Sequence, residues 1–406
     1  MNPLYWEWLS FASRWLHVVT AIAWIGSSFY FIALDLGLRK RPDLAPGVTG
    51  EEWQVHGGGF YYIQKYMVAP EAMPEHLIWF KWEAYSTWLT GFLMLIVVYY
   101  AGAELYLIDR AVLDVPAWGA ILISLAGLVI GWAVYDLLCR SPLGRSFWIL
   151  SAVLFGFIVL LSWGFTQVFT GRAAFLHSGA VIATIMSANV FMIIIPNQKK
   201  VVTTLRAGGT PEAVLGLQAK QRSNHNNYLT LPVIFLMLSN HYPLAFGTQW
   251  NWLIVSLVLV MGVTIRHYFN SMHAGKGKPW WTWGVAALCF AAIVWLSTFP
   301  AETPEEFDVG ESQDPLYVSN SFEDVRDTVL GRCSMCHAQE PLWEGIGVAP
   351  KGVMLETDEQ ILRHARQIYL QAGRTSAMPP GNVTEISGEE RRLIASWFEE
   401  ANAVRR

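Results

Sequence analysis

Long apolar segments, separated by shorter polar ones, fill the first three-quarters of the chain. A helix needs about 20 mostly apolar residues to cross the hydrocarbon core of a bilayer. Eight segments reach or approach that length and predict eight transmembrane helices. They are Phe11–Leu34, His76–Tyr100, Val115–Leu138, Phe147–Phe165, Arg172–Ile195, Asn226–Ser239, Asn251–His267 and Trp281–Phe299. The sixth is short and contains Pro232, so taken alone it also suits a re-entrant segment.

Basic residues in the connecting loops predict an orientation and favour eight crossings. Thirteen Lys and Arg residues lie in four loops on one side, namely residues 35–75, 139–146, 196–225 and 268–280. The other side carries Arg110 and Arg172. Since cytoplasmic loops hold the excess of Lys and Arg, the four loops are predicted to be cytoplasmic and both chain ends to lie outside. If the sixth segment did not cross, the last basic loop would fall on the wrong side.

The pattern changes after residue 299. Residues 300–317 are acidic, contain Pro and have few aliphatic side chains, which predicts an exposed linker. Residues 318–406 contain three amphipathic segments, each opened by Ser or Asp, which predict helices. These are Ser321–Leu330, Asp358–Ala372 and Ser387–Asn402. The predicted fold is therefore all-α, with an eight-helix transmembrane bundle in residues 1–299 and a small C-terminal domain.

A Cys-x-x-Cys-His motif follows the first of these C-terminal helices. Cys333 and Cys336 hold two thiols about one helical turn apart, and His337 follows directly, which is the spacing of covalent haem c attachment. A Cys-x-x-Cys pair also occurs in zinc and redox sites, but this part of the sequence has no second Cys/His pair to complete a zinc site. The C-terminal domain is therefore predicted to be a class I-like cytochrome c domain, with His337 as a ligand of the haem iron.

Three residues are candidates for the second axial ligand of that iron: Met354, His364 and Met378. Met378 is preferred because "TSAMPPGN" is a Pro- and Gly-rich loop between two predicted helices, as in cytochrome c domains. Met/His ligation raises the reduction potential, so this haem should accept electrons readily. Haem c is attached outside the cytoplasmic membrane, on the side that the loop charges predict for the tail. Both arguments favour a bacterial inner-membrane protein with a periplasmic cytochrome.

The overall composition agrees with a membrane protein and limits the partners. Charged residues make up 15% of the chain and hydrophobic residues 53%, whereas an average soluble domain is about 25% charged. The net charge of −4 is too small to indicate a nucleic-acid partner. The lipid bilayer is the expected surrounding of residues 1–299.

Ionisable and amide side chains inside the apolar segments are candidates for function. "HLIWFKWEAYSTW" carries Lys81 and Glu83, and "QRSNHNNYLTLP" carries His225, Asn226 and Asn227. Amide and cationic side chains suit a planar, carbonyl-rich anion. The alternative is that these side chains cap helix ends or extend to the membrane interface.

Several segments together resemble a known family. "HVVTAIAWIGSSFYFIALD", "FKWEAYSTWLTGF", "SANVFMIIIPNQKK" and "SNHNNYLTLPVIFLMLSNHYP", followed by an acidic linker and "CSMCH", resemble membrane-bound bacterial urate oxidases (urate hydroxylases) that end in a cytochrome c domain. The resemblance implies oxidation of urate to 5-hydroxyisourate in purine catabolism. It also implies that electrons pass to the fused haem c, and then to a periplasmic cytochrome or terminal oxidase, instead of to O2.

For this chemistry the hypothesis is a base that takes a proton from urate while two electrons leave, followed by addition of water at C5. Glu83 and His225 are candidates for the base, and Lys81 or Arg222 for holding the anion.

Three histidines are candidates for ligands of a second haem. "RWLHVVTAIAWIGSSFYF" resembles the first helix of membrane haem-binding families, which implies that His17, with His177 or His241, binds a haem b. Such a relay is needed if urate is oxidised near the cytoplasmic side, because about 30 Å of hydrocarbon then separates it from the outside. If the substrate binds from outside, no relay is required. The alternative for each histidine is a hydrogen bond to a neighbour at a helix end.

Two other functions are compatible with the sequence. A quinol- or dehydrogenase-linked electron-transfer cytochrome without its own substrate predicts quinol-dependent haem reduction and no urate turnover. A haem-handling or transport protein predicts no redox change linked to a substrate.

Overall fold

The chain folds into two compact units, each considered by itself. In this computed structural model the first unit comprises Met1–His241 and Gln249–Ser297, and the second Tyr242–Thr248 and Thr298–Arg406. The structure describes residues 3–66, 70, 73–108, 112–239, 242–246, 248, 250–298, 315–343, 346, 349–374, 378–379 and 384–404. Most of these residues are helical.

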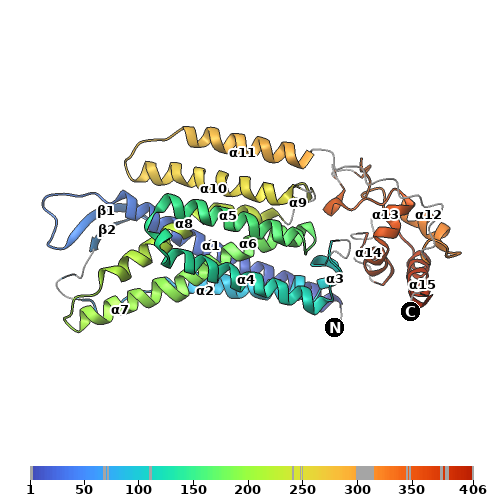
Figure 1. The fold of residues 1–406 in the computed structure, drawn as a ribbon, viewed down its shortest axis with the longest axis horizontal. Helices are drawn as coiled ribbons and strands as arrows, with labels where there is room; N and C mark the ends of the chain where they lie inside the picture. Colours follow the sequence, from blue (N-terminus) through green and yellow to red (C-terminus); the bar gives the residue numbers. More distant parts are fainter. Residues whose placement is uncertain are drawn as a thin grey trace. The chain divides into compact units, whose positions relative to one another are not determined.

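Each of the eight apolar segments lies in or overlaps a helix of the first unit, and the long helices run side by side (Figure 1). The helices are α1 (Pro3–Gly37), α2 (Trp82–Met94) with the π-helix η1 (Leu95–Tyr100), α3 (Ala103–Tyr106), α4 (Ala117–Arg140), the 3-10 turn η2 (Pro142–Arg145), α5 (Phe147–Thr166), α6 (Gly171–Ala188) with the π-helix η3 (Asn189–Ile194) and α7 (Ile195–Arg206), α8 (Ala213–Leu238), α10 (Asn251–His273) and α11 (Trp281–Thr298).

Five helices in the described part of the chain are long and apolar enough to cross a membrane. They are Trp8–Gly37, Ala117–Arg140, Phe147–Thr166, Gly171–Arg206 and Asn251–His273. Their length matches the thickness of a bilayer, which makes them compatible with a membrane location.

Three helices start well away from the residues that the apolar pattern predicts. α1 begins at Pro3 instead of Phe11. α8 begins at Ala213, because the polar stretch before Asn226 continues the helix instead of ending it. α2 begins at Trp82, so His76 and Lys81 lie outside it. Arg206 donates hydrogen bonds to the backbone carbonyl of Glu75 (3.0 Å), which holds that segment against α7.

The prediction of an entirely helical fold is wrong in the loop after α1. β1 (Val48–His56) and β2 (Gly59–Tyr66) form an antiparallel hairpin there. Gly57 and Gly58, with φ of 58° and 80°, supply the two positive φ angles that a two-residue hairpin turn needs. Charge alone marked this segment as a loop, whereas its β-branched and aromatic residues on either side of two glycines were the signal for strands.

The basic loops gather at one end of the first unit, here named the basic end. Figure 1 shows the β1–β2 hairpin, the α7–α8 turn and the α10–α11 turn at that end. Gln221 of α8 also donates to the carbonyl of Gly144 in the α4–α5 turn, at 3.0 Å. The sequence predicts this end to be cytoplasmic.

The second unit contains the three predicted C-terminal helices around an apolar core. They are α12 (Phe322–Arg332), a middle segment divided at His364 into α13 (Asp358–Arg363), α14 (Ala365–Ile368) and the π-helix η7 (Tyr369–Gly373), and α15 (Gly388–Val404); the unit also holds α9 (Pro243–Phe246) and the 3-10 turn η6 (Pro350–Gly352). Val329, Ile361 and Trp397 are fully buried in its core. The indole N–H of Trp397 donates to the carbonyl of Leu316 at 2.9 Å.

Candidate functional site

Buried and half-buried polar side chains of α4, η3 and α8, with a backbone carbonyl of α6, form a hydrogen-bonded cluster in the first unit. The Asn189 amide donates to the Tyr135 hydroxyl and to the Asn226 carbonyl oxygen, both at 2.9 Å. Asn226 donates in turn to the backbone carbonyl of Met186 at 2.9 Å. The Tyr135 hydroxyl also lies 2.7 Å from Nδ1 of His225. The structure thus brings together His225 and Asn226, two of the predicted site residues, with two residues that were not predicted.

A π-helical turn places Asn189 at the centre of this cluster. η3 begins at Asn189, and π-turns inside α-helices occur frequently at functional sites. Asn189 is fully buried, and its carbonyl oxygen has no hydrogen-bond partner among the described residues. This oxygen is therefore available to accept a hydrogen bond from a ligand.

Arg222 adds a buried cation to the cluster. Its guanidinium forms an ion pair with Asp136 at 2.7 Å and lies 4.9 Å from the centre of the Tyr135 ring. Nε and one terminal nitrogen of Arg222 are buried and have no partner in the described part of the chain. Because buried charges require partners, these N–H groups are suited to an anion.

Asn227 lies in a separate contact between α8 and α10. Arg266 donates a hydrogen bond from Nε to the Asn227 side-chain oxygen, and its guanidinium lies 4.2 Å from the Phe29 ring centre. One terminal nitrogen of Arg266 is buried without a partner in the described residues. Neighbouring asparagines on α8 therefore serve two different polar contacts.

Glu83 and Lys81 have different environments. Glu83 lies in the first turn of α2, and one of its carboxylate oxygens is buried without a partner among the residues that the structure describes. α2 packs on α6 here, since Ser187 donates to the carbonyl of Ala84 at 3.2 Å. Lys81 precedes the helix and lies over the ring of Trp82. Glu83 is thus next to Ala84, which contacts α6 two residues before Asn189. The Lys81 contact is instead typical of a residue at a helix end.

The histidines proposed for haem b lie on different helix pairs. His17 of α1 is bonded through Nδ1 to the Thr87 carbonyl of α2 at 3.1 Å, a contact that is compatible with iron binding through Nε2. His177 uses both ring nitrogens, with Ala173 at 2.7 Å and Ser124 at 2.6 Å, and the Phe169 ring centre lies 4.7 Å away. His177 as it stands does not fit an axial haem ligand. His241 lies outside the described residues.

The Cys-x-x-Cys-His segment of the second unit fits covalent haem. Backbone bonds from Cys336 and His337 to the Cys333 carbonyl, at 3.1 and 2.9 Å, continue the turn after α12 and keep the two thiols one turn apart. Both cysteines are free of disulfides. His337 Nδ1 lies 2.9 Å from the Val353 carbonyl, which orients the ring as outer-shell bonds orient metal-ligating histidines.

Met378 is held by its backbone on the same unit. Its N–H donates to the Gln371 carbonyl at 2.9 Å, and its carbonyl accepts a bond from Arg391 of α15, also at 2.9 Å. The chain around Met378 is thereby fixed to η7 and α15. This anchoring suits the role of axial ligand better than the partly exposed position of Met354.

Comparison with protein families gives one finding. A family model described as urate oxidase N-terminal matches residues 3–297, well over half of the chain. The chain belongs to this family. Comparisons with curated proteins and with solved structures found no match. The urate oxidase match covers the polar residues of α2, α4, η3, α8 and α10, and ends before Cys333. It therefore links the first unit to urate and to oxidoreductase chemistry.

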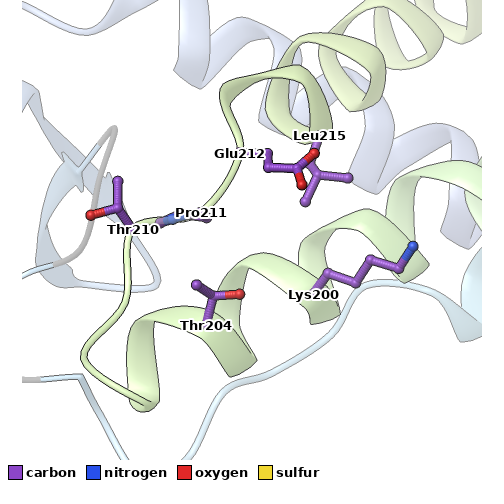
Figure 2. A pocket seen from close by; sticks show the side chains of 6 residues that line it. All are labelled: Lys200, Thr204, Thr210, Pro211, Glu212 and Leu215. Atoms are coloured by element: carbon purple, nitrogen blue, oxygen red, sulfur yellow. The ribbon is translucent and has the colours of Figure 1, made fainter.

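A cavity of about 360 Å³ lies at the α7–α8 corner of this urate oxidase unit, and its lining side chains are seen in Figure 2. Its lining consists of Lys200, Thr204, Thr210, Pro211, Glu212 and Leu215. None of the predicted site residues lines it, and the side chains in view come from the two helix ends and the turn between them.

Three residues of the urate oxidase unit's polar cluster were missed from the sequence: Tyr135, Asp136 and Asn189. Asp136 is the one carboxylate in the segment Val115–Leu138, so the rule that ionisable residues in apolar segments are functional would have found it. Tyr135 and Asn189 carry no such charge signal.

Proposed function

We propose that the protein is a membrane-bound oxidoreductase that converts urate to 5-hydroxyisourate and passes the electrons to a haem c on its second unit. The family match supports urate, and the apolar helices support a membrane location. The observation that carries the site assignment is Arg222, a buried guanidinium with two nitrogens that lack partners in the described residues.

The reaction balances without O2: urate and water give 5-hydroxyisourate, two electrons and two protons. Arg222 holds the urate anion, and the amides of Asn189 and Asn226 bond its carbonyl and N–H groups. His225, positioned by Tyr135 at 2.7 Å, takes a proton from urate as the electrons leave, and water then adds at C5. Glu83, with its unpaired buried oxygen, is the second candidate for this base.

The second unit provides the exit for the electrons. A haem c bound to Cys333 and Cys336, with His337 and Met378 as axial ligands, would supply a one-electron acceptor of raised potential. In this proposal the second unit is periplasmic, the membrane is the bacterial inner membrane, and a periplasmic cytochrome or terminal oxidase receives the electrons.

The test is a urate assay under argon. Purified full-length protein is mixed with urate and oxidised external cytochrome c, and both absorbances are followed. The expected result is urate loss with two cytochromes reduced per urate. No urate loss with intact haem would overturn the proposal, and urate loss that requires O2 would overturn its electron path. Quinol-dependent reduction without urate turnover would favour the electron-transfer alternative.

A pyridine haemochrome spectrum of the same preparation tests the proposed cofactors. Haem c is expected. Additional haem b would support a relay bound through His17, whereas haem c alone would remove that relay.

A further inference from the structure

One face of α10 near the basic end carries three buried polar atoms that lack partners. Arg266, Asn270 and His273 follow each other at intervals of four and three residues, so they share one side of the helix. A terminal nitrogen of Arg266, Oδ1 of Asn270 and Nδ1 of His273 are each buried with no hydrogen-bond partner among the described residues. The three residues share a face of α10 that leads to its last turn.

The facing side of α8 is polar over the same length. Lys220 and Ser223 precede Asn227 by seven and four residues and share its face of the helix. Asn227 accepts the hydrogen bond from Arg266, and Gly262 of α10 contacts Pro232 of α8, so the two helices run antiparallel. Ser223 and Lys220 therefore lie alongside the stretch of α10 after Arg266. These six residues, Lys220, Ser223, Asn227, Arg266, Asn270 and His273, are named the polar α8–α10 interface.

This interface is closed at one end and open at the other. Beyond Arg266, Gly262 packs directly on Pro232 of α8, so closely that a Cβ on Gly262 would lie 2.5 Å from the proline Cδ. Towards the basic end, Lys220 and the neighbouring Asn224 are exposed. A polar path that starts at the basic end therefore stops at Arg266 and Asn227.

Buried polar atoms in native proteins almost always have a partner, and ordered water or a ligand supplies it where the chain does not. Three such atoms on one helix face require several waters or a ligand with many polar groups. Lys220 and Arg266, with Lys276 and Lys278 in the adjacent α10–α11 turn, make the surroundings cationic. A cationic path with low-dielectric walls attracts anions.

We propose that the polar α8–α10 interface is a hydrated path that admits the urate anion from the basic end as far as Arg266, across α8 from the polar cluster. The identity of the anion rests on the proposed function. Asn227, at the end of the path, is next to Asn226 of the polar cluster on α8. A urate anion bound at Arg266 is therefore separated from Arg222 by the width of α8. The terminal nitrogen of Arg266 that has no partner in the described residues is the first buried cationic donor that the anion meets.

The test is chemical labelling of Asn270→Cys in the full-length protein in membrane vesicles. A membrane-impermeant anionic methanethiosulfonate is added from the side of the basic end, and modification of residue 270 is measured by peptide mass. Labelling of N270C is expected, with protection by excess urate. The matched control is Ser256→Cys, which is equally buried on α10 but lies beyond the Gly262–Pro232 contact, and it should stay unlabelled.

Absence of N270C labelling, or labelling from the opposite side alone, would overturn the path. Labelling that urate does not reduce would overturn its assignment to urate. These measurements are masses and do not depend on turnover, so they are distinct from the urate assay that tests the proposed function.

A kinetic variant gives a second measurement. Asn270→Leu removes the polar group in the middle of the path and should exclude water there. The KM for urate should rise about tenfold with kcat little changed, which corresponds to a loss of about 1.4 kcal/mol in binding free energy. Asn270→Ser, which keeps a small polar group, should restore most of the affinity. An unchanged KM in N270L would contradict the proposal.

Discussion

Asp136 binds two arginines that differ strongly in their surroundings. Arg222 reaches one carboxylate oxygen at 2.7 Å and is 3% exposed, whereas Arg140 reaches the other at 2.6 Å and is 59% exposed. An exposed ion pair contributes about 0–1 kcal/mol, while removal of one partner from a buried pair leaves an uncompensated charge. Because both arginines bind the same carboxylate, substitution of Arg140 is the control for substitution of Arg222.

Replacement of Arg222 by Gln should raise the KM for urate by at least about tenfold, because the N–H groups that hold the anion are lost. Arg140→Gln, at the exposed side of Asp136, should change the KM by less than about twofold. Both values are measured in the argon assay with external cytochrome c. Equal effects of the two substitutions would contradict a role of Arg222 in urate binding.

Single residues could be predicted from the sequence only where charge or a motif singled them out. Cys333, Cys336 and His337 are assigned to haem c from spacing alone, and this assignment stays a prediction. His225 and Asn226 were identified as polar residues in an apolar segment, but their partners Tyr135 and Asn189 could not be, because a contact between helices depends on which faces pack. His177 looked like a metal ligand, since no sequence pattern reveals that Ser124 and Ala173 occupy its ring nitrogens.

Close helix packing at the element scale makes Gly262 sensitive to substitution. Gly262→Ala should destabilise the first unit by about 1–3 kcal/mol, since its Cβ would overlap Pro232 of α8. Gly284→Ala in α11 is the control, because a Cβ there meets nothing within 4 Å and Ala favours a helix by up to about 1 kcal/mol. Thermal unfolding in detergent measures both variants. A lower midpoint for G284A than for G262A would contradict the packing argument.

The start of α15 should make the second unit sensitive to acid. Glu390 accepts a bond from the Ser387 backbone N–H at 2.6 Å and pairs with Arg332 at 3.0 Å, and these contacts, the backbone bond most, lower the pKa of its carboxyl. Its stabilising effect is present above the ordinary pKa of about 4.3 and is lost as the pH falls through the lower folded value. In Glu390→Gln the thermal midpoint should therefore decrease less steeply below about pH 4.3 than in the unmodified protein. Haem absorbance measures the thermal unfolding. An unchanged pH profile would contradict this.

Whole elements were predictable where length and periodicity agreed. The long apolar helices and the three C-terminal helices satisfy both. The hairpin of β1 and β2 does not follow from the basic residues of its segment, and its signal is the pair of turn glycines, Gly57 and Gly58, between β-branched and aromatic residues. The π-helical turn at Asn189 could not be foreseen, since its residues are ordinary helix formers and the extra residue per turn is stabilised by packing.

At the scale of the whole molecule, each unit has its own core, and the urate oxidase match ends at residue 297. The double variant Cys333→Ser/Cys336→Ser should lack covalent haem and lose urate-dependent reduction of external cytochrome c. Urate oxidation with a small artificial acceptor such as ferricyanide should persist, because the polar cluster is untouched. Loss of urate oxidation with both acceptors, in a variant that remains monodisperse by gel filtration, would contradict the proposal that the first unit oxidises urate without the haem of the second unit.

η3 also fixes the rotational phase between two asparagines. Asn189 precedes the extra residue of the π-turn, and Asn197 follows it and donates to Gln218 of α8 at 3.1 Å. Deletion of one residue within η3 would restore α-helical geometry and rotate all of α7 by about 100°. Asn189 and Asn197 could then no longer both face α8. The number of residues between them is thus as constrained as their identity, because an insertion or deletion there would break at least one of the two contacts.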